Sequence, residues 1–142
     1  MRARQTLDAP EALVLTMVLV AAAEGGMSDR EIGVMAGQVQ TLPIFHDFTT
    51  EQLRVATDAA VQLLNEDDGL SHASRLLRSA LEPRLRETAY ALACEVFAAD
   101  HVTRQRALDM LEFVRSELQI DPLIAAAIER GARARHQRAA AG

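Results

Sequence analysis

The chain has 142 residues, a formal net charge of −5, and a composition that is 49% apolar but only 4% aromatic. This length suits one domain with a continuous core, and the scarcity of alternating β-branched and aromatic residues favours helices over a sheet. All 15 basic residues are arginine, so no lysine is available for Schiff-base chemistry or a phosphate-binding P-loop. The negative charge argues against a general nucleic-acid-binding protein, and the single cysteine is compatible with a reducing cytoplasm.

The N-terminal segment imitates a signal peptide, because Arg2 and Arg4 precede the uncharged run Ala12–Ala23. However, the preceding segment Asp8–Glu11 is typical of a helix start, with an N-cap acid, a proline in the first turn and a second acid three residues later. The run of 12 uncharged residues is also too short to span a bilayer. We therefore expect it to form a buried core helix.

The remaining helices are predicted from caps, prolines and the spacing of apolar residues. Together with the first, they give seven helices and no strands, over residues 10–23, 28–40, 49–64, 71–81, 83–99, 104–118 and from 122 onward. Helical spacing places two sets of residues on inward faces: Ile32, Met35, Ala36 and Val39 in the second helix, and Leu123, Ile124, Ala127 and Ile128 in the last. Gly33 and Gly37, four residues apart, are expected to allow close approach of a neighbour.

One stretch of the sequence occurs twice. Val20–Met35 (VAAAEGGMSDREIGVM) aligns without a gap to Val96–Leu111 (VFAADHVTRQRALDML) after a shift of 76 residues, the distance from Glu24 to Asp100 (100 − 24). Both copies are typical of a helix, an acidic turn and a second helix. We therefore predict a compact all-α bundle in a single domain, 1–142, with pseudo-symmetric repeat units at 10–40 and 83–118 and a basic, frayed tail at 130–142.

The acidic turns are the strongest candidate site. Glu24, Asp29 and Glu31 cluster in the first turn, and Asp100 occupies the place of Glu24 in the second. If the two turns meet, their carboxylates could hold a hard divalent cation. The alternative is structural: Asp29 and Glu31 would complement the positive end of the following helix, and Glu24 would be a solvated helix end.

Three further features allow other functions. Asp100 and His101 could form an acid–base pair in a small hydrolase-type enzyme, although a surface histidine is the simpler interpretation. Four arginines within Arg130–Arg138 could bind anionic lipid as a membrane-surface adaptor, nucleic acid, or the acidic surface of a partner. They could also merely complement the C-terminal end of a helix. Cys94, with its apolar neighbours, is expected to be a core thiol rather than a nucleophile.

The segment Ala22–Glu31 (AAEGGMSDRE) resembles the Ala-x-Asp-Gly-x-hydrophobic-Ser-x-x-Glu unit of the TerB-like tellurite-resistance family, and Ala98–Thr103 resembles it less well. The resemblance extends over nearly the whole chain, and it implies an all-helical domain of two related halves from bacterial cytoplasm. It also implies turn carboxylates as metal ligands, which here are Glu24, Glu31 and Asp100. The sequence departs from the pattern at Glu24, which replaces an aspartate, at His101, which replaces a glycine, and at Ala107, which replaces the second glutamate.

The resemblance implies a non-enzymatic stress-response domain that acts in the cytoplasm as an interaction module. The expected partner is a protein, with a membrane-associated protein as one candidate, and no nucleic acid is expected. The expected ligand is a divalent cation: calcium, magnesium or zinc.

Overall fold

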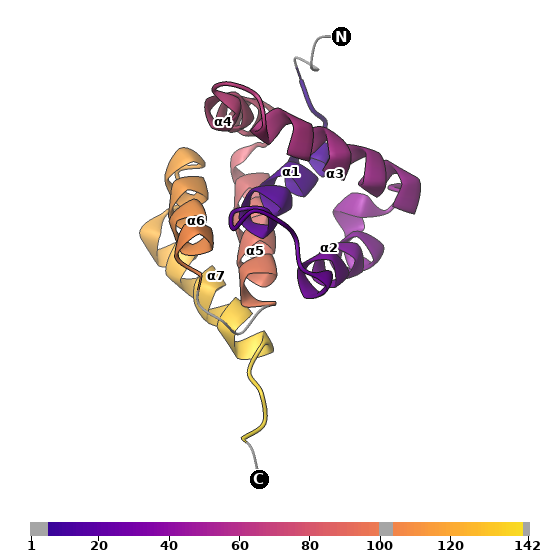
Figure 1. The fold of residues 1–142 in the computed structure, drawn as a ribbon. Coiled ribbons are helices and arrows are strands. Elements are labelled where there is room, and N and C mark those ends of the chain that lie inside the picture. The colour runs from indigo at the N-terminus through magenta and orange to yellow at the C-terminus, as the bar shows by residue number, and fades with distance from the viewer. Residues whose placement is uncertain (1–5, 100–103, 141–142) are drawn as a thin grey trace.

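The computed structural model describes residues 6–99 and 104–140, and in these ranges every element of regular secondary structure is a helix (Figure 1). The elements are α1 (Ala9–Ala21), α2 (Asp29–Thr41), the short 3-10 helix η1 (Pro43–Phe45), α3 (Thr50–Leu64), α4 (Gly69–Ala80), α5 (Pro83–Ala98), α6 (Gln105–Glu117) and α7 (Pro122–Arg135). The prediction of seven helices without strands is confirmed for the described residues. Among these residues, no helix is long and apolar enough to cross a membrane.

Local caps explain where most of the helices begin. The side chains of Asp8, Ser28 and Thr49 each accept a hydrogen bond from the backbone N–H three residues later, and the side chain of that later residue accepts a hydrogen bond from the backbone N–H of the cap residue. Asp121 caps α7 in front of a proline, and α5 also starts at a proline. These side chains satisfy backbone groups that the first helical turn leaves without intrahelical partners. The sequence therefore specifies these helix starts through contacts within one turn.

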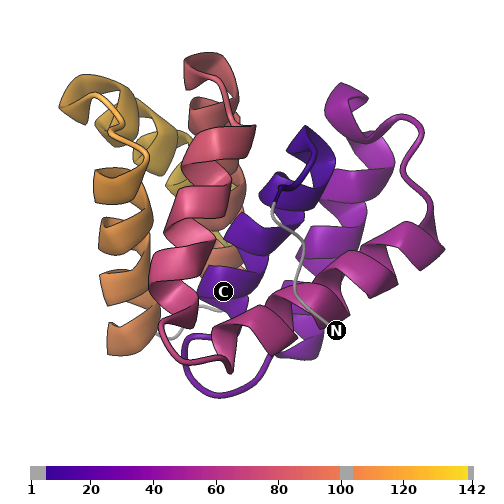
Figure 2. The same ribbon diagram turned by 90° about the horizontal axis from the view of Figure 1, so that it is seen from above.

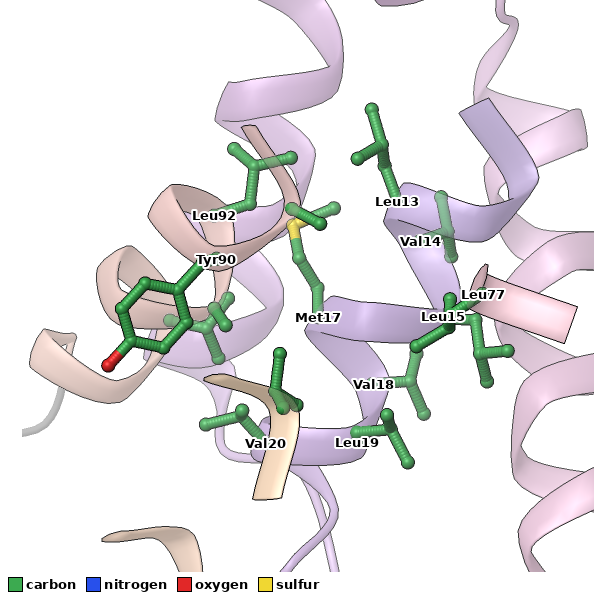
Figure 3. Close-up of a cluster of buried hydrophobic side chains, with 14 of the residues drawn as sticks. Leu13, Val14, Leu15, Met17, Val18, Leu19, Val20, Leu77, Tyr90 and Leu92 are labelled. Atoms are coloured by element: carbon green, nitrogen blue, oxygen red, sulfur yellow. The ribbon is translucent and has the colours of Figure 1, made fainter. Parts of the chain in front are cut away.

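Helix α1 is the centre of the core. Every residue from Ala12 to Ala21 is buried, and α1 contacts α2, α3, α4, α5 and α6. Figure 3 shows its side chains pointing outward in all directions, with Met17 toward α5 and Leu15 toward Leu77 of α4. A helix that is apolar on every side requires neighbours on every side, which explains its central position. The prediction that Ala12–Ala23 forms a buried core helix is confirmed for residues up to Ala21.

The other helices surround α1 in two groups. Helices α2 and α3 lie on one side of α1, whereas α6 and α7 lie on the other side, next to α5 (Figures 1 and 2). Helix α5 packs along α1 and also supports α6 and α7. One hydrophobic cluster includes buried residues from all seven α-helices. The two predicted repeat units correspond to α1–α2 and α5–α6, but their pseudo-symmetry remains a prediction.

The predicted inward face of α2 is confirmed at Met35 and Val39 but wrong at Ile32. Met35 and Val39 are buried as expected, but Ile32 is 47% exposed and Glu31 is completely buried in its place. The reason is that Glu31 has donors inside the protein, which compensate for the desolvation of its carboxylate. Because burying Glu31 turns the next residue outward, the apolar pattern alone does not give the orientation of this helix.

The predicted inward face of α7 is wrong to a greater extent. Leu123 is 80% exposed and Ile124 is 37% exposed, whereas the small residues Ala125 and Ala132 are buried against the bundle. Small side chains allow α7 to lie close to α5, the helix that it mainly contacts. The prediction for Gly33 and Gly37 is also wrong, because a side-chain carbon at either position would meet no atom within 4 Å.

Candidate functional site

The acidic turn between α1 and α2 meets the start of α6. Glu24 Oε2 accepts hydrogen bonds from the backbone N–H groups of Arg106 (2.8 Å) and Ala107 (3.2 Å). Arg104, the N-cap residue of α6, makes no side-chain capping bond. Glu24 therefore supplies the missing cap from a distant part of the chain and places a negative charge at the positive end of the helix dipole.

A second contact links the same two segments, again with a carboxylate of the first segment accepting from a donor of the second. Arg104 donates from Nη2 to Glu31 Oε2, while Glu31 Oε1 accepts from the backbone N–H of Ser28 at 2.8 Å. Because the Glu31 carboxylate is fully buried, both of its oxygens are satisfied by protein donors rather than by water. The starts of α2 and α6 are therefore joined through one ion pair and one long-range cap.

The structure brings two of the three predicted metal ligands to one junction but gives each of them protein partners. Asp100 and His101 lie outside the described residues, so the predicted cation site and the Asp100–His101 acid–base pair both remain predictions. Within residues 6–99 and 104–140, no three His, Cys, Asp or Glu side chains are grouped so that they could hold a metal. Glu31 caps the start of α2, as the structural alternative expected, whereas Glu24 caps α6 rather than being a solvated helix end.

A second buried carboxylate, which the sequence analysis did not single out, attaches the end of α7 to α5. Glu95 is only 7% exposed, and its Oε2 accepts from Arg135 Nε at 2.8 Å while its Oε1 lies 3.0 Å from His136 Nε2. The hydrogen bond to Glu95 raises the pKa of Arg135 above its usual range. These contacts hold the first part of the basic segment, residues 130–142, in helix α7, which continues to Arg135.

A pocket of about 680 Å³ lies between α5, α6 and α7. Helices α6 and α7 both pack on α5. We call the apolar side chains that line this pocket its floor. The lining residues are Tyr90, Cys94, Phe97, Ala98, Leu108, Leu111, Glu112, Arg115, Glu129, Ala132, Arg133, His136, Gln137 and Arg138. The apolar members come mainly from α5 and α6, whereas α7 and the residues after it contribute most of the charged and polar groups. The pocket volume lies in the range of sites for small organic ligands.

The groups of the pocket that could act as nucleophiles are held in their protonated forms. Burial raises the pKa of the Cys94 thiol to about 12. Burial also raises the pKa of Tyr90, and so does the hydrogen bond from its hydroxyl to Glu129 Oε2 at 2.5 Å. The Tyr90 hydroxyl points away from α1, toward the outer side of the bundle (Figure 3). At neutral pH, neither group supplies an anion, which suits binding better than covalent chemistry.

The arginines around the pocket differ in their partners. Arg115 Nη1 lies 3.7 Å from Glu129 Oε2, and Arg135 is held by Glu95 outside the pocket. In the described part of the chain, Arg133 and Arg138 have no carboxylate within ion-pair distance. The four arginines of the basic segment are therefore not equivalent, and two of them are available to a ligand at the pocket.

The sequence pattern did not predict this pocket. Its floor residues Cys94, Leu108 and Leu111 follow the ordinary apolar pattern of core helices, so they carry no separate signal. The available signal was the concentration of arginine after Glu129 in an otherwise acidic chain. That signal indicates an anion-binding surface but not the apolar floor beside it.

Comparisons of the chain with protein-family models, with curated proteins and with solved structures gave no match.

Proposed function

We propose that this chain is a non-enzymatic binding domain whose site is the pocket between α5, α6 and α7. The observation that carries this proposal is the pocket itself, with an apolar floor, charged groups on its α7 side, and a volume suited to one small ligand. The raised pKa values of Cys94 and Tyr90 support binding rather than nucleophilic catalysis. In this proposal, Glu24 and Glu31 have a structural role, because protein donors already occupy their oxygens.

The biological setting that we propose follows from the resemblance of Ala22–Glu31 to the TerB-like repeat. It is a stress response in bacterial cytoplasm, in which the domain acts with a protein partner. The all-helical architecture is consistent with this setting but is common to many helical domains, so the resemblance carries this part of the proposal alone.

The test is ligand screening by NMR on isotopically labelled protein, with a mixed set of small anionic, cationic and neutral fragments that each contain an apolar part. We expect at least one fragment to shift the amide signals of residues around the pocket, such as Cys94, Leu111 and Ala132. The same fragment should not shift these signals in Ala98→Phe, because a phenyl ring at this partly exposed lining residue fills the pocket.

A thermal melt of Ala98→Phe shows whether the variant is folded. Binding of every fragment at other surfaces, or no binding at all, would overturn the proposal. If Ala98→Phe does not fold, competition between two fragments for the same amide signals in the unmodified protein decides the question.

A further inference from the structure

We infer that the pocket between α5, α6 and α7 binds a single-chain amphiphile with a carboxylate head, of the class of fatty acids. This inference rests on the proposed function and names the class of ligand. Two observations lead to it: the floor of the pocket is apolar, and two arginines at the pocket lack anionic partners.

The apolar part of the pocket suits an alkyl chain. Cys94 and Phe97 of α5, Leu108 and Leu111 of α6, and Ala132 of α7 all line it. These side chains offer no strong hydrogen-bonding groups, so a polar ligand such as free phosphate would lose its hydration there without compensation. An alkyl chain, in contrast, gains free energy in proportion to the apolar area that it removes from water.

The charges at the pocket favour an anionic head. Arg133 and Arg138 are available, and guanidinium groups match the geometry of a carboxylate. On the acidic side, Glu129 is already bound by the Tyr90 hydroxyl and lies 3.7 Å from Arg115. Glu112 is the one carboxylate of the pocket without a partner among the described residues, so the available charge is positive in a chain whose net charge is −5.

The other lining groups do not change this balance. His136 is held by Glu95, which is itself shared with Arg135, and this cluster fixes the end of α7 beside the pocket. Arg133 is exposed on α7, and Arg138 follows the end of that helix. The head of the ligand would therefore lie on the α7 side of the pocket, and its chain would extend over α5 and α6.

The chain contains its own probe for this inference. Tyr90 is the only tyrosine and there is no tryptophan, so the intrinsic fluorescence of the protein comes from a residue that lines the pocket. We would titrate the protein with sodium dodecanoate, kept below the concentration at which it forms micelles, and follow the emission of Tyr90. Circular dichroism at the end point confirms that the helices are intact.

The specificity for head and chain is tested with matched probes. We expect saturable binding of dodecanoate, at least about tenfold weaker binding of dodecanol and dodecyltrimethylammonium, and at least about tenfold weaker binding of hexanoate. Equal binding of dodecanol or dodecyltrimethylammonium would overturn the inference and leave the proposed function standing. If dodecanoate fails but another fragment occupies the pocket in the NMR screen, only the inference fails. If nothing occupies it, the proposed function fails as well.

Paired variants test the role of the arginines. Arg133→Gln/Arg138→Gln should weaken dodecanoate binding at least about tenfold, because two charge-assisted contacts are lost. The control Arg75→Gln/Arg130→Gln removes the same charge from exposed positions outside the pocket and should change the affinity less than about twofold. Glu112→Gln should strengthen binding, because it removes a repelling charge. An equal loss of affinity in both double variants would overturn the inference.

A membrane is the competing source of an anionic amphiphile. We would therefore measure sedimentation of the protein with phosphatidylglycerol vesicles. Binding to vesicles without saturable binding of free dodecanoate would overturn the inference in favour of a membrane-surface role for the basic segment. Binding of dodecanoate that Arg133→Gln/Arg138→Gln abolishes, without binding to vesicles, would support it.

Discussion

Two regions that helix α6 helps to form differ in whether their charged side chains have partners within the protein. At its start, Glu24 caps the backbone and Arg104 pairs with the buried Glu31, so these three charged groups have partners within the protein. At the pocket that α6 shares with α5 and α7, Arg133 and Arg138 remain without carboxylate partners among the described residues. The first region contributes to stability, whereas the second has charges free to bind a ligand. The comparison supports the proposal that the binding site lies where charged groups lack partners, not where charges are most numerous.

The largest effect is expected at the Glu31–Arg104 ion pair. Glu31→Ala should reduce the free energy of unfolding by about 3–5 kcal/mol, because it removes one partner of a buried pair. It also removes the hydrogen bond that Glu31 accepts from the backbone N–H of Ser28. Urea denaturation measures this loss. The double-mutant cycle with Arg104→Ala isolates the coupling between the two side chains. A loss below about 1 kcal/mol would contradict the structural role of the junction.

The predicted cation site can be tested at the same junction. A divalent cation held by Glu24, Glu31 and Asp100 at about a hundred times its dissociation constant would stabilise the protein by roughly 2.7 kcal/mol. The melting temperature would then rise by about 2–8 °C with calcium, magnesium or zinc relative to EDTA. This rise should disappear in Glu24→Ala/Asp100→Ala. Identical melting temperatures with EDTA and with each ion would leave the carboxylates with structural roles only.

The pH dependence of stability tests the burial of Cys94 and Tyr90 at the pocket. Both groups have raised pKa values in the folded state, so the unfolded chain loses these protons first as the pH rises. The stabilisation is therefore complete below about pH 8.5, the usual pKa of a thiol, and is lost as the pH rises toward 12.

For one proton, the slope reaches at most about 1.4 kcal/mol per pH unit. Urea denaturation at pH 8, 9.5 and 11 measures this slope, and Cys94→Ala should make it smaller between pH 8.5 and 10. An unchanged slope in Cys94→Ala would show that the thiol does not contribute.

The smallest effect on stability is expected where the charges are unsatisfied. Arg133→Gln/Arg138→Gln should change the free energy of unfolding by no more than about 0.5 kcal/mol, because neither arginine has a partner to lose. The contrast with Glu31→Ala is the clearest check on the comparison of the two regions. A loss above about 1.5 kcal/mol in urea denaturation would mean that these arginines stabilise the fold.

Much of the fold could be predicted because its signals are local. Asp8, Ser28, Thr49 and Asp121 act within one helical turn of their own positions, and prolines at the starts of α1, α5 and α7 support the same boundaries. The central position of α1 also follows from its own composition, since a helix that is apolar on all sides must be covered on every side.

The candidate site could be predicted only in part. The repeat suggested that the two acidic turns could meet, and this stays a prediction because the turn at Asp100 lies outside the described residues. The structure joins Glu24 to the start of α6 and Glu31 to Arg104. The pocket, in contrast, was missed, because its floor uses the same leucines, alanines and cysteine that any helical core uses. Its position depends on how α6 and α7 diverge over α5, which no single segment encodes.

The sequence by itself therefore determined the helices, their boundaries and the burial of α1, since each depends on neighbours within a few residues or on local composition. Only the tertiary structure decided which carboxylates are satisfied, why Glu31 is buried in place of Ile32, and why Leu123 lies outside while Ala125 lies inside. These outcomes depend on partners far away in the chain. The free energy of burying a charge or a small side chain is set by what the rest of the fold places against it.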